Sequence, residues 1–290
     1  MRHYLIVAGA LALALATPAT AQDTARDAGA AVAPDGIDTS GDHITVAAAG
    51  VYLPDYEGSN DYRFTAAPAA IGTIKGYGFT LLGNRASVNL IRARPGPGVN
   101  FELGPIGVIN FNRSSTGQIS DPRVKALGKV GTAVELGGYV GVNKTGVITS
   151  PYDVLTFTVS YRHDVSAVHK SYVVTPSVNY ITPLSRKLAA GVFGSMDIAG
   201  RRYAQRYESV SLGQSLVSGL PVYTAHGGVA SYTLGGFATA SLTGDLLHGF
   251  KVVAGGTYSR ELGSFSYSPL TRIAGSPSQW IGAAGLAYTF

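Results

Sequence analysis

The sequence predicts an all-β protein, a transmembrane antiparallel β-barrel of about 12 strands, and three observations support this fold class. Apolar and aromatic residues alternate with small or polar ones in many short segments, and the chain ends on an aromatic-rich strand. No stretch offers the roughly 20 continuous apolar residues of a membrane-spanning helix. Only 13% of the residues are charged, whereas about 25% is usual in a soluble domain. Much of the surface is therefore expected to face lipid.

The N-terminal 42 residues are expected to lie outside the barrel. Residues 1–21 have the features of a secretory signal peptide, because Arg2 precedes an uncharged run and Ala19-Thr20-Ala21 forms a cleavage site. Residues 22–42 contain no aromatic residue and are expected to form a flexible periplasmic leader. The barrel then occupies residues 43–290. The chain has no cysteine, which excludes disulfides and thiolate chemistry.

The strands are expected at intervals along the whole of residues 43–290, with a count of 10 as the main alternative. Pro68, Pro105 and Pro176 weaken three of them, since proline donates no ladder hydrogen bond. The expected strands lie near residues 43–52, 64–73, 77–83, 86–92, 100–111, 130–142, 153–163, 171–181, 188–197, 228–242, 249–260 and 279–290.

Alternation within these strands favours a barrel over a soluble sandwich. Leu155, Phe157, Val159 and Tyr161 alternate with Thr156, Thr158 and Ser160. A sandwich would carry many Lys and Glu on its polar face, whereas this face is mostly Thr, Ser, Gly and Ala. Small polar residues are therefore expected to line the lumen, with the apolar residues facing lipid.

Loop lengths predict the orientation. The long connections, near residues 54–62, 112–129, 164–170, 199–227 and 261–278, all fall between strands that start from the same side. Bacterial barrels have long outer loops and short periplasmic turns. Both termini are therefore expected in the periplasm, and the protein in the outer membrane of a Gram-negative cell.

The closing strand is the most informative single segment. Trp280, Tyr288 and Phe290 share one face with Gly282 and Leu286, and smaller residues lie between them. This pattern suits a strand that meets lipid and carries rings at the interface.

Charged residues on the predicted inner faces are Glu102, Glu135, Arg162 and Lys251. Two interpretations fit them equally well. They form a filter for small ions, or they pair with one another and plug a narrow barrel, because about 12 strands lie between filled 8-stranded barrels and open 16-stranded porins.

Catalytic and metal-binding chemistry is not expected. His163 with Asp164, His169 with Ser171, and His226 are the candidates for a base near a nucleophile, but neighbouring strand residues point to opposite faces and no G-x-S-x-G elbow is present. These histidines are interpreted as loop residues exposed to water. The six histidines lack metal-ligand spacing, so no cofactor and no zinc are expected.

Two charged segments offer other binding hypotheses. Carboxylates in residues 55–63 could bind calcium, but a turn held by acid–base pairs fits better, because an EF-hand's ligand spacing is missing. Arg201, Arg202 and Arg206 alternate with tyrosines, as in proteins that stack nucleic-acid bases. An exported barrel meets no nucleic acid, so lipopolysaccharide phosphates are the expected partner of these arginines.

Several motifs together resemble the MipA/OmpV family of MltA-interacting outer-membrane proteins. The first is the segment Pro54-Asp55-Tyr56-Glu57-Gly58-Ser59-Asn60-Asp61-Tyr62-Arg63, which is similar to the P-x-Y-E-G-S-x-D-Y-R sequence of that family. The others are Leu127-Gly128-Lys129-Val130, Ser218-Gly219-Leu220-Pro221-Val222-Tyr223, Ser268-Pro269-Leu270 with Gly275-Ser276 and Gln279, and the closing Gly285-Leu286-Ala287-Tyr288-Thr289-Phe290. The resemblance covers essentially the whole chain after the signal peptide.

The resemblance implies a scaffold that links a murein-degrading lytic transglycosylase to a murein-synthesising penicillin-binding protein. Other family members are described as porin-like or adhesive. Two functions of different class therefore remain open: a non-enzymatic scaffold of the outer membrane, and a small-solute pore. Fold alone does not decide between them.

Overall fold

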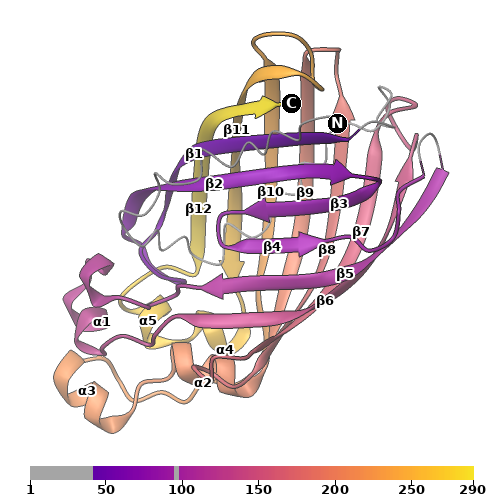
Figure 1. Ribbon diagram of the computed structural model, residues 1–290. Coiled ribbons are helices and arrows are strands. Elements are labelled where there is room, and N and C mark those ends of the chain that lie inside the picture. Colours follow the sequence, from indigo (N-terminus) through magenta and orange to yellow (C-terminus); the bar gives the residue numbers. More distant parts are fainter. Residues whose placement is uncertain (1–41, 95–97) are drawn as a thin grey trace, which may run out of the picture.

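The computed structural model describes residues 42–94 and 98–290, which form a closed antiparallel β-barrel (Figure 1). Twelve strands pair in sequence order, and the first strand closes the barrel against the last. The 12-strand prediction is confirmed, and the 10-strand alternative is wrong. The predicted signal peptide and all but the last residue of the predicted leader lie outside the described residues.

The observed strands agree with the expected ones to within a few residues. They are β1 (His43–Pro54), β2 (Tyr62–Ile74), β3 (Tyr77–Leu82), β4 (Arg85–Val88), β5 (Gly98–Asn110), β6 (Ala133–Thr145), β7 (Val154–Asp164), β8 (Tyr172–Pro183), β9 (Leu188–Ala199), β10 (Gly228–Ser241), β11 (Gly249–Glu261) and β12 (Ser278–Thr289). Pro68, Pro105 and Pro176 all lie inside strands, and the ladder continues past each of them.

Side chains alternate across the wall as the sequence predicts. On β7, Phe157, Val159 and Tyr161 are about half exposed on the outer face, whereas Ser160 is buried inside. Trp280 and Leu286 of β12 also face outward. An apolar exterior on a closed barrel is what the hydrocarbon core of a membrane requires.

Aromatic rings gather at the two ends of the outer wall. Stacked or tilted pairs lie near the long connections, and a cluster lies near the short turns. The pairs are Tyr52 with Tyr62, Tyr161 with Tyr172 and Tyr258 with Trp280, and the cluster is Phe250, Tyr288 and Phe290. These positions are those of the two aromatic girdles of an outer-membrane barrel.

The long connections fold into a helical cap over one end of the barrel (Figure 1). This cap comprises residues 55–61, 111–132, 165–171, 200–227 and 262–277. Its short helices are η2 (Thr116–Gln118), α1 (Pro122–Ala126), α2 (Arg201–Glu208), α3 (Leu212–Ser218), α4 (Gly263–Ser266) and α5 (Pro269–Arg272). Among the described residues, no helix is long and apolar enough to cross a membrane.

Local signals explain where the cap helices begin and end. Asp121 accepts hydrogen bonds from the backbone of Arg123 and Val124 at the start of α1, and Ser211 and Gln214 form a capping box on α3. Gly219 ends α3 with a φ of 74°, a left-handed conformation that favours glycine.

The β3–β4 hairpin is shorter than the rest of the wall. Its tip lies at Gly83 and Asn84, where Gly83 N donates to the Pro68 carbonyl at 2.9 Å and Ile109 N donates to the Asn84 carbonyl at 2.9 Å. Beyond this tip, residues 62–68 of β2 pair only with β1 in the ladder. The wall is therefore lower between β2 and β5.

Candidate functional site

The helical cap has its own apolar core, which closes the long-loop end of the barrel. One cluster surrounds α2, where Tyr203 and Tyr207 are four residues apart on the buried face. A second cluster joins Tyr56, Leu220 and Leu270. The first cluster also contains Val130, Val173, Ala199, Ala204, Ala225, Ala230 and Phe265. The second cluster also contains Ile119, Val124, Leu127, Val210 and Ala274.

The opposite face of α2 is basic. Arg201, Arg202 and Arg206 are exposed, while Tyr203 and Tyr207 are buried. The tyrosines are therefore unable to stack on a ligand together with these arginines. The alternation of Arg and Tyr is the amphipathic pattern of a short helix that packs on the cap core.

The motif segment at residues 54–63 meets the motif segment at residues 268–279 inside the cap. The Tyr56 hydroxyl donates to the carbonyls of Leu270 and Ala274, at 3.2 Å each. Gln279 Nε2 donates to the Ser59 carbonyl at 2.9 Å. The sequence did not indicate this pairing, because about 220 residues separate the partners.

Gly58 and Gly275 permit the close approach of these two segments. Gly58 has a φ of +91°, which an L side chain rarely adopts. A Cβ on Gly275 would lie 1.8 Å from the Gly58 carbonyl oxygen. The next residue, Ser276, donates its backbone N–H to that same oxygen at 2.7 Å.

The acidic residues of the 54–63 segment bind neighbouring loops. Asp55 Oδ2 accepts the Ser120 N–H at 2.8 Å. Glu57 Oε2 accepts from Asn112 Nδ2 at 3.0 Å and from the Tyr203 hydroxyl at 3.2 Å. Within residues 42–94 and 98–290, no three His, Asp or Glu side chains lie close enough to hold a metal ion. These contacts make the motif a joint between cap loops.

Glu135 and Arg162 lie together in the lumen beneath the cap. Arg162 Nε is 2.5 Å from Glu135 Oε2, and neither side chain is exposed. Arg162 Nη1 also donates to Thr175 Oγ1 at 3.0 Å, and Asn110 Nδ2 donates to Glu135 Oε1 at 3.0 Å. A buried pair that is hydrogen-bonded on both sides fills space and holds strands together.

His169 belongs to this network, which corrects the interpretation of the histidines as exposed loop residues. His169 is buried, and its Nε2 is 3.2 Å from Glu135 Oε1. Its ring meets the Tyr203 ring edge-on, with the centroids 5.0 Å apart. This burial was not predictable from the sequence, because the ring is covered by α2, some 30 residues further along the chain.

The other two candidate histidines, His163 and His226, do not belong to the Arg162–Glu135 network. His163 is exposed on the outer face of β7, and Asp164 beside it is buried on the inner side. His226 is exposed, and its backbone N–H donates to Ser264 Oγ at 2.8 Å. Ser171 is buried. The exposed-loop interpretation therefore holds for His226, but it is wrong for His169, which is buried, and for His163, which lies on a strand.

Glu102 and Lys251 also point into the lumen but lie outside the Arg162–Glu135 network. Glu102 Oε1 accepts from Asn143 Nδ2 at 2.7 Å. Lys251 Nζ donates to Thr289 Oγ1, close to the short turns. The four lumen charges thus form no single ring in this structure.

Burial controls the electrostatics of the cap. It raises the pKa of Glu208, at the end of α2, to about 8. It lowers the pKa of Arg113, whose guanidinium donates to the Tyr207 carbonyl at 2.8 Å and to the Gly128 carbonyl at 3.3 Å. It also raises the pKa of Tyr56. The cap therefore holds ionisable groups in a largely dry interior.

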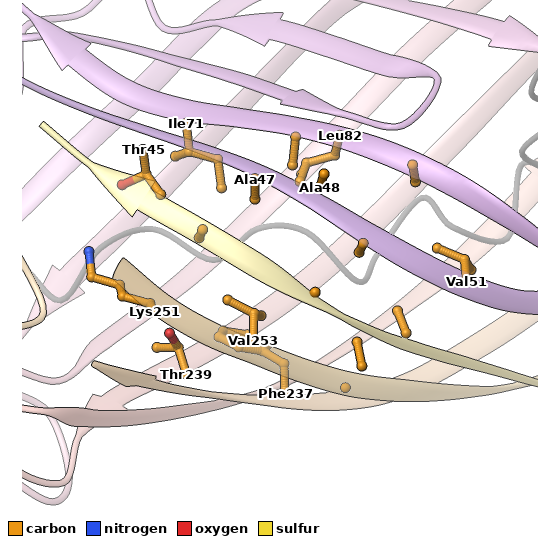
Figure 2. A pocket seen from close by; sticks show the side chains of 18 of the residues that line it. Thr45, Ala47, Ala48, Val51, Ile71, Leu82, Phe237, Thr239, Lys251 and Val253 are labelled. Carbon is orange, nitrogen blue, oxygen red and sulfur yellow. The ribbon is translucent and has the colours of Figure 1, made fainter. Parts of the chain in front are cut away.

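An apolar cavity of about 210 Å³ occupies the half of the lumen nearest the short turns (Figure 2). Alanine and glycine predominate in its lining, together with a few larger apolar side chains. The sequence predicted a lumen face made mostly of Thr, Ser, Gly and Ala, and small residues do line this half, but alanine and glycine outnumber the polar ones. On β11, Val253 faces inward and its neighbour Val252 faces outward, although the two residues are equally apolar.

Comparison with known families gives one match. The family described as "MltA-interacting protein MipA" matches residues 46–290. No curated protein matches the sequence.

Solved structures with a similar fold are outer-membrane proteins of low sequence identity. Outer-membrane OmpT of Vibrio cholerae is 9% identical, with a TM-score of 0.35, covering 86% of this chain and 97% of that one. The channel DcaP of Acinetobacter baumannii is 7% identical, with a TM-score of 0.37, covering 86% and 96%. An outer-membrane channel of Pseudomonas putida F1 is 11% identical, with a TM-score of 0.38, covering 89% and 98%.

Proposed function

The chain belongs to the MltA-interacting protein MipA family and folds as an outer-membrane β-barrel, and on that premise we propose that it is a non-enzymatic scaffold. Its role is to hold a murein-degrading lytic transglycosylase beside a murein-synthesising penicillin-binding protein. The family description supports the first partner, and the resemblance of the motifs supports the second.

The observation that carries this proposal is the closed long-loop end. Two apolar clusters fill the cap, and the Arg162–Glu135 pair lies beneath it with no exposed side-chain surface. A passive pore needs a continuous polar path from end to end. A lumen filled at this end leaves the outer surfaces of the barrel as the working part.

The short-turn end supplies the surface for periplasmic partners. A murein enzyme reaches the barrel from the side on which the peptidoglycan lies. Exposed basic side chains gather in these turns, namely Lys75, Arg92, Arg94, Lys144, Arg186 and Lys187. A partner with an acidic patch would be steered to such a rim.

The cap supplies the opposite, outward-facing surface. Arg201, Arg202 and Arg206 point away from its core on α2. Arginine binds phosphate through two parallel hydrogen bonds, so this face suits the phosphates of lipopolysaccharide. We further propose that residues 1–21 act as a signal peptide that directs export.

Affinity capture tests the scaffold. The folded barrel, immobilised in detergent, is expected to retain a purified lytic transglycosylase or penicillin-binding protein. Reversing two charges in a short turn, Arg186→Glu with Lys187→Glu, is expected to weaken capture at least tenfold. The matched reversal on the cap, Arg201→Glu with Arg202→Glu, is expected to leave capture unchanged. Equal effects of the two reversals would argue against docking at the short-turn end.

Planar-bilayer recording separates the scaffold from the small-solute pore. The intact barrel is expected to show no stable conductance. Replacing residues 201–226 by a short Gly-Ser linker removes α2 and α3. The shortened barrel is expected to show a stable conductance. Stable, charge-selective currents from the intact chain, altered by Lys251→Glu or Glu135→Lys, would favour the pore instead.

A further inference from the structure

The apolar cavity in the lumen has the shape of a site for a chain-like ligand. It lies against the inward faces of six neighbouring strands, in the order β3, β2, β1, β12, β11 and β10 (Figure 2), and Ile181 of β8 and Ala189 of β9 also line it. Its larger apolar side chains include Val51, Ile71, Leu82, Phe237, Val253 and Ile281. A water-filled channel would have a polar lining, whereas apolar walls favour hydrocarbon.

One end of the cavity is polar and positively charged. Lys251, Thr239 and Thr45 lie together there (Figure 2), and His43 also lines the cavity. Lys251 Nζ donates to Thr289 Oγ1, which is 2.7 Å from Thr45 Oγ1. The residue as a whole is 4% exposed.

Within residues 42–94 and 98–290, no carboxylate neutralises this ammonium directly. Among the described residues, no ion pair includes Lys251. The acid with an electrostatic effect on it is Asp245, whose Oδ1 already accepts the backbone N–H groups of Leu247 and His248 at 2.8 and 3.0 Å. A mostly buried cation without an anionic partner costs stability, so an anion beside it would be bound favourably.

We propose that the lumen binds an anionic amphiphile, a single acyl chain of medium length whose carboxylate pairs with Lys251 and whose tail lies against Phe237, Ile71 and Val51. The volume sets the length. A cavity of about 150 Å³ holds the six carbons of benzene, or ~25 Å³ per carbon. The 210 Å³ found here therefore fits about eight carbons.

The test is equilibrium dialysis of radiolabelled octanoate against the purified barrel in detergent, corrected for empty micelles. Octanol carries the same chain without the charge, and butyrate carries the charge on a shorter chain. Each variant is first checked for folding by its heat-modifiable mobility on a gel. The expected result is one saturable octanoate site per barrel, with weaker binding of butyrate.

Two variants probe the two parts of the site. Lys251→Met keeps the length of the side chain and removes its charge, and it is expected to weaken octanoate binding at least tenfold while leaving octanol unchanged. Ala67→Leu fills the cavity from its β2 wall and is expected to weaken both ligands at least tenfold. Its neighbour Ala66 faces outward, so Ala66→Leu is the matched control and should bind like the unaltered chain.

Three outcomes would overturn the proposal. The first is the absence of saturable octanoate binding. The second is binding that neither Lys251→Met nor Ala67→Leu changes, since the detergent would then hold the ligand. The third is binding that appears only after residues 22–41 are removed, since the leader would then be the occupant. None of these outcomes bears on capture of a murein enzyme, which is measured separately.

Discussion

Arg162 and Glu135 form an ion pair on the diagonal of the β6–β7 ladder, with Nε and Oε2 2.5 Å apart and both side chains buried. The residue directly opposite Arg162 is Gly137. A Cβ on Gly137 would lie 1.8 Å from the Tyr161 carbonyl oxygen, so the backbones meet closely at this point. The pair therefore ties two strands at the level where the cap begins.

Removing one partner of this pair should destabilise the barrel strongly. In Glu135→Gln the buried Arg162 guanidinium loses its close counter-charge and keeps Asp197, whose Oδ1 is 4.0 Å from Arg162 Nη2. The expected loss in the free energy of unfolding is about 3 kcal/mol. Urea unfolding in lipid vesicles measures it. The exposed pair of Asp245 and His248, 3.5 Å apart, is the control, because Asp245→Asn should cost less than about 1 kcal/mol. Similar losses for both variants would contradict a structural role for the buried pair.

The stability of the cap should fall as the pH rises from about 5 to about 8. Burial raises the pKa of Glu208 from 4.5 to about 8 in the folded cap. Across that interval the unfolded cap loses the Glu208 proton while the folded cap keeps it, so unfolding becomes more favourable. Hydrogen exchange of the α2 and α5 amides, corrected for intrinsic rates, should show more frequent opening at pH 8 than at pH 5. Glu208→Gln should remove most of this pH dependence, and an unchanged dependence would assign it to another group.

The proposed orientation predicts which loops face the outside of the cell. The chain has no native cysteine, so a thiol reagent labels only the cysteine that is introduced. Ser211 in the cap and Ser185 in a short turn are both exposed, which makes them a matched pair. A cysteine at Ser211 should react with an impermeant maleimide on intact cells, and one at Ser185 should react only after the outer membrane is opened. The reverse labelling pattern would mean that the barrel has the opposite orientation in the membrane.

Deleting Phe290 should impair assembly into the outer membrane. Its backbone N–H donates to the Ile44 carbonyl at 3.0 Å, where the last strand meets the first, and its ring packs on Tyr288 with the centroids 4.8 Å apart. Heat-modifiable mobility of membrane fractions measures the assembled share. Phe290→Tyr keeps both the backbone contact and the ring and should assemble normally. Normal assembly of the deletion variant would mean that closure does not depend on the terminal residue.

The strands could be predicted from sequence because each one carries its own evidence. Phe157 and Val159 face lipid while Ser160 faces the lumen, so a two-residue period is visible within a few positions. The cap could not be predicted in this way. Its helices are 3 to 8 residues long, too short to be stable without tertiary contacts. Their partners, such as Tyr56 and Leu270, are far apart in the chain.

The lumen was partly predictable. Glu135 and Arg162 stand out as charges on inward positions of apolar strands, yet only the fold brings His169 beside them. The apolar cavity could not be predicted from the sequence, for a different reason. Val252 and Val253 are identical residues on opposite faces, so alternation alone does not distinguish the side that meets lipid from the side that meets a ligand.

The hairpin of β3 and β4 is short, and its length is expected to affect the thickness of the surrounding bilayer. These strands have 6 and 4 residues, against 11 to 14 in the other strands, and about 9–11 residues are needed to cross the hydrocarbon core. Acyl chains beside the hairpin are therefore expected to shorten or tilt to match it, so that the membrane is thinnest on this flank. Pro68, Leu82 and Gly83, at the edge of the low wall, also line the cavity. Thinned lipid and the lumen thus meet at the edge of a short wall, which makes this flank the shortest route between the membrane and the interior of the barrel.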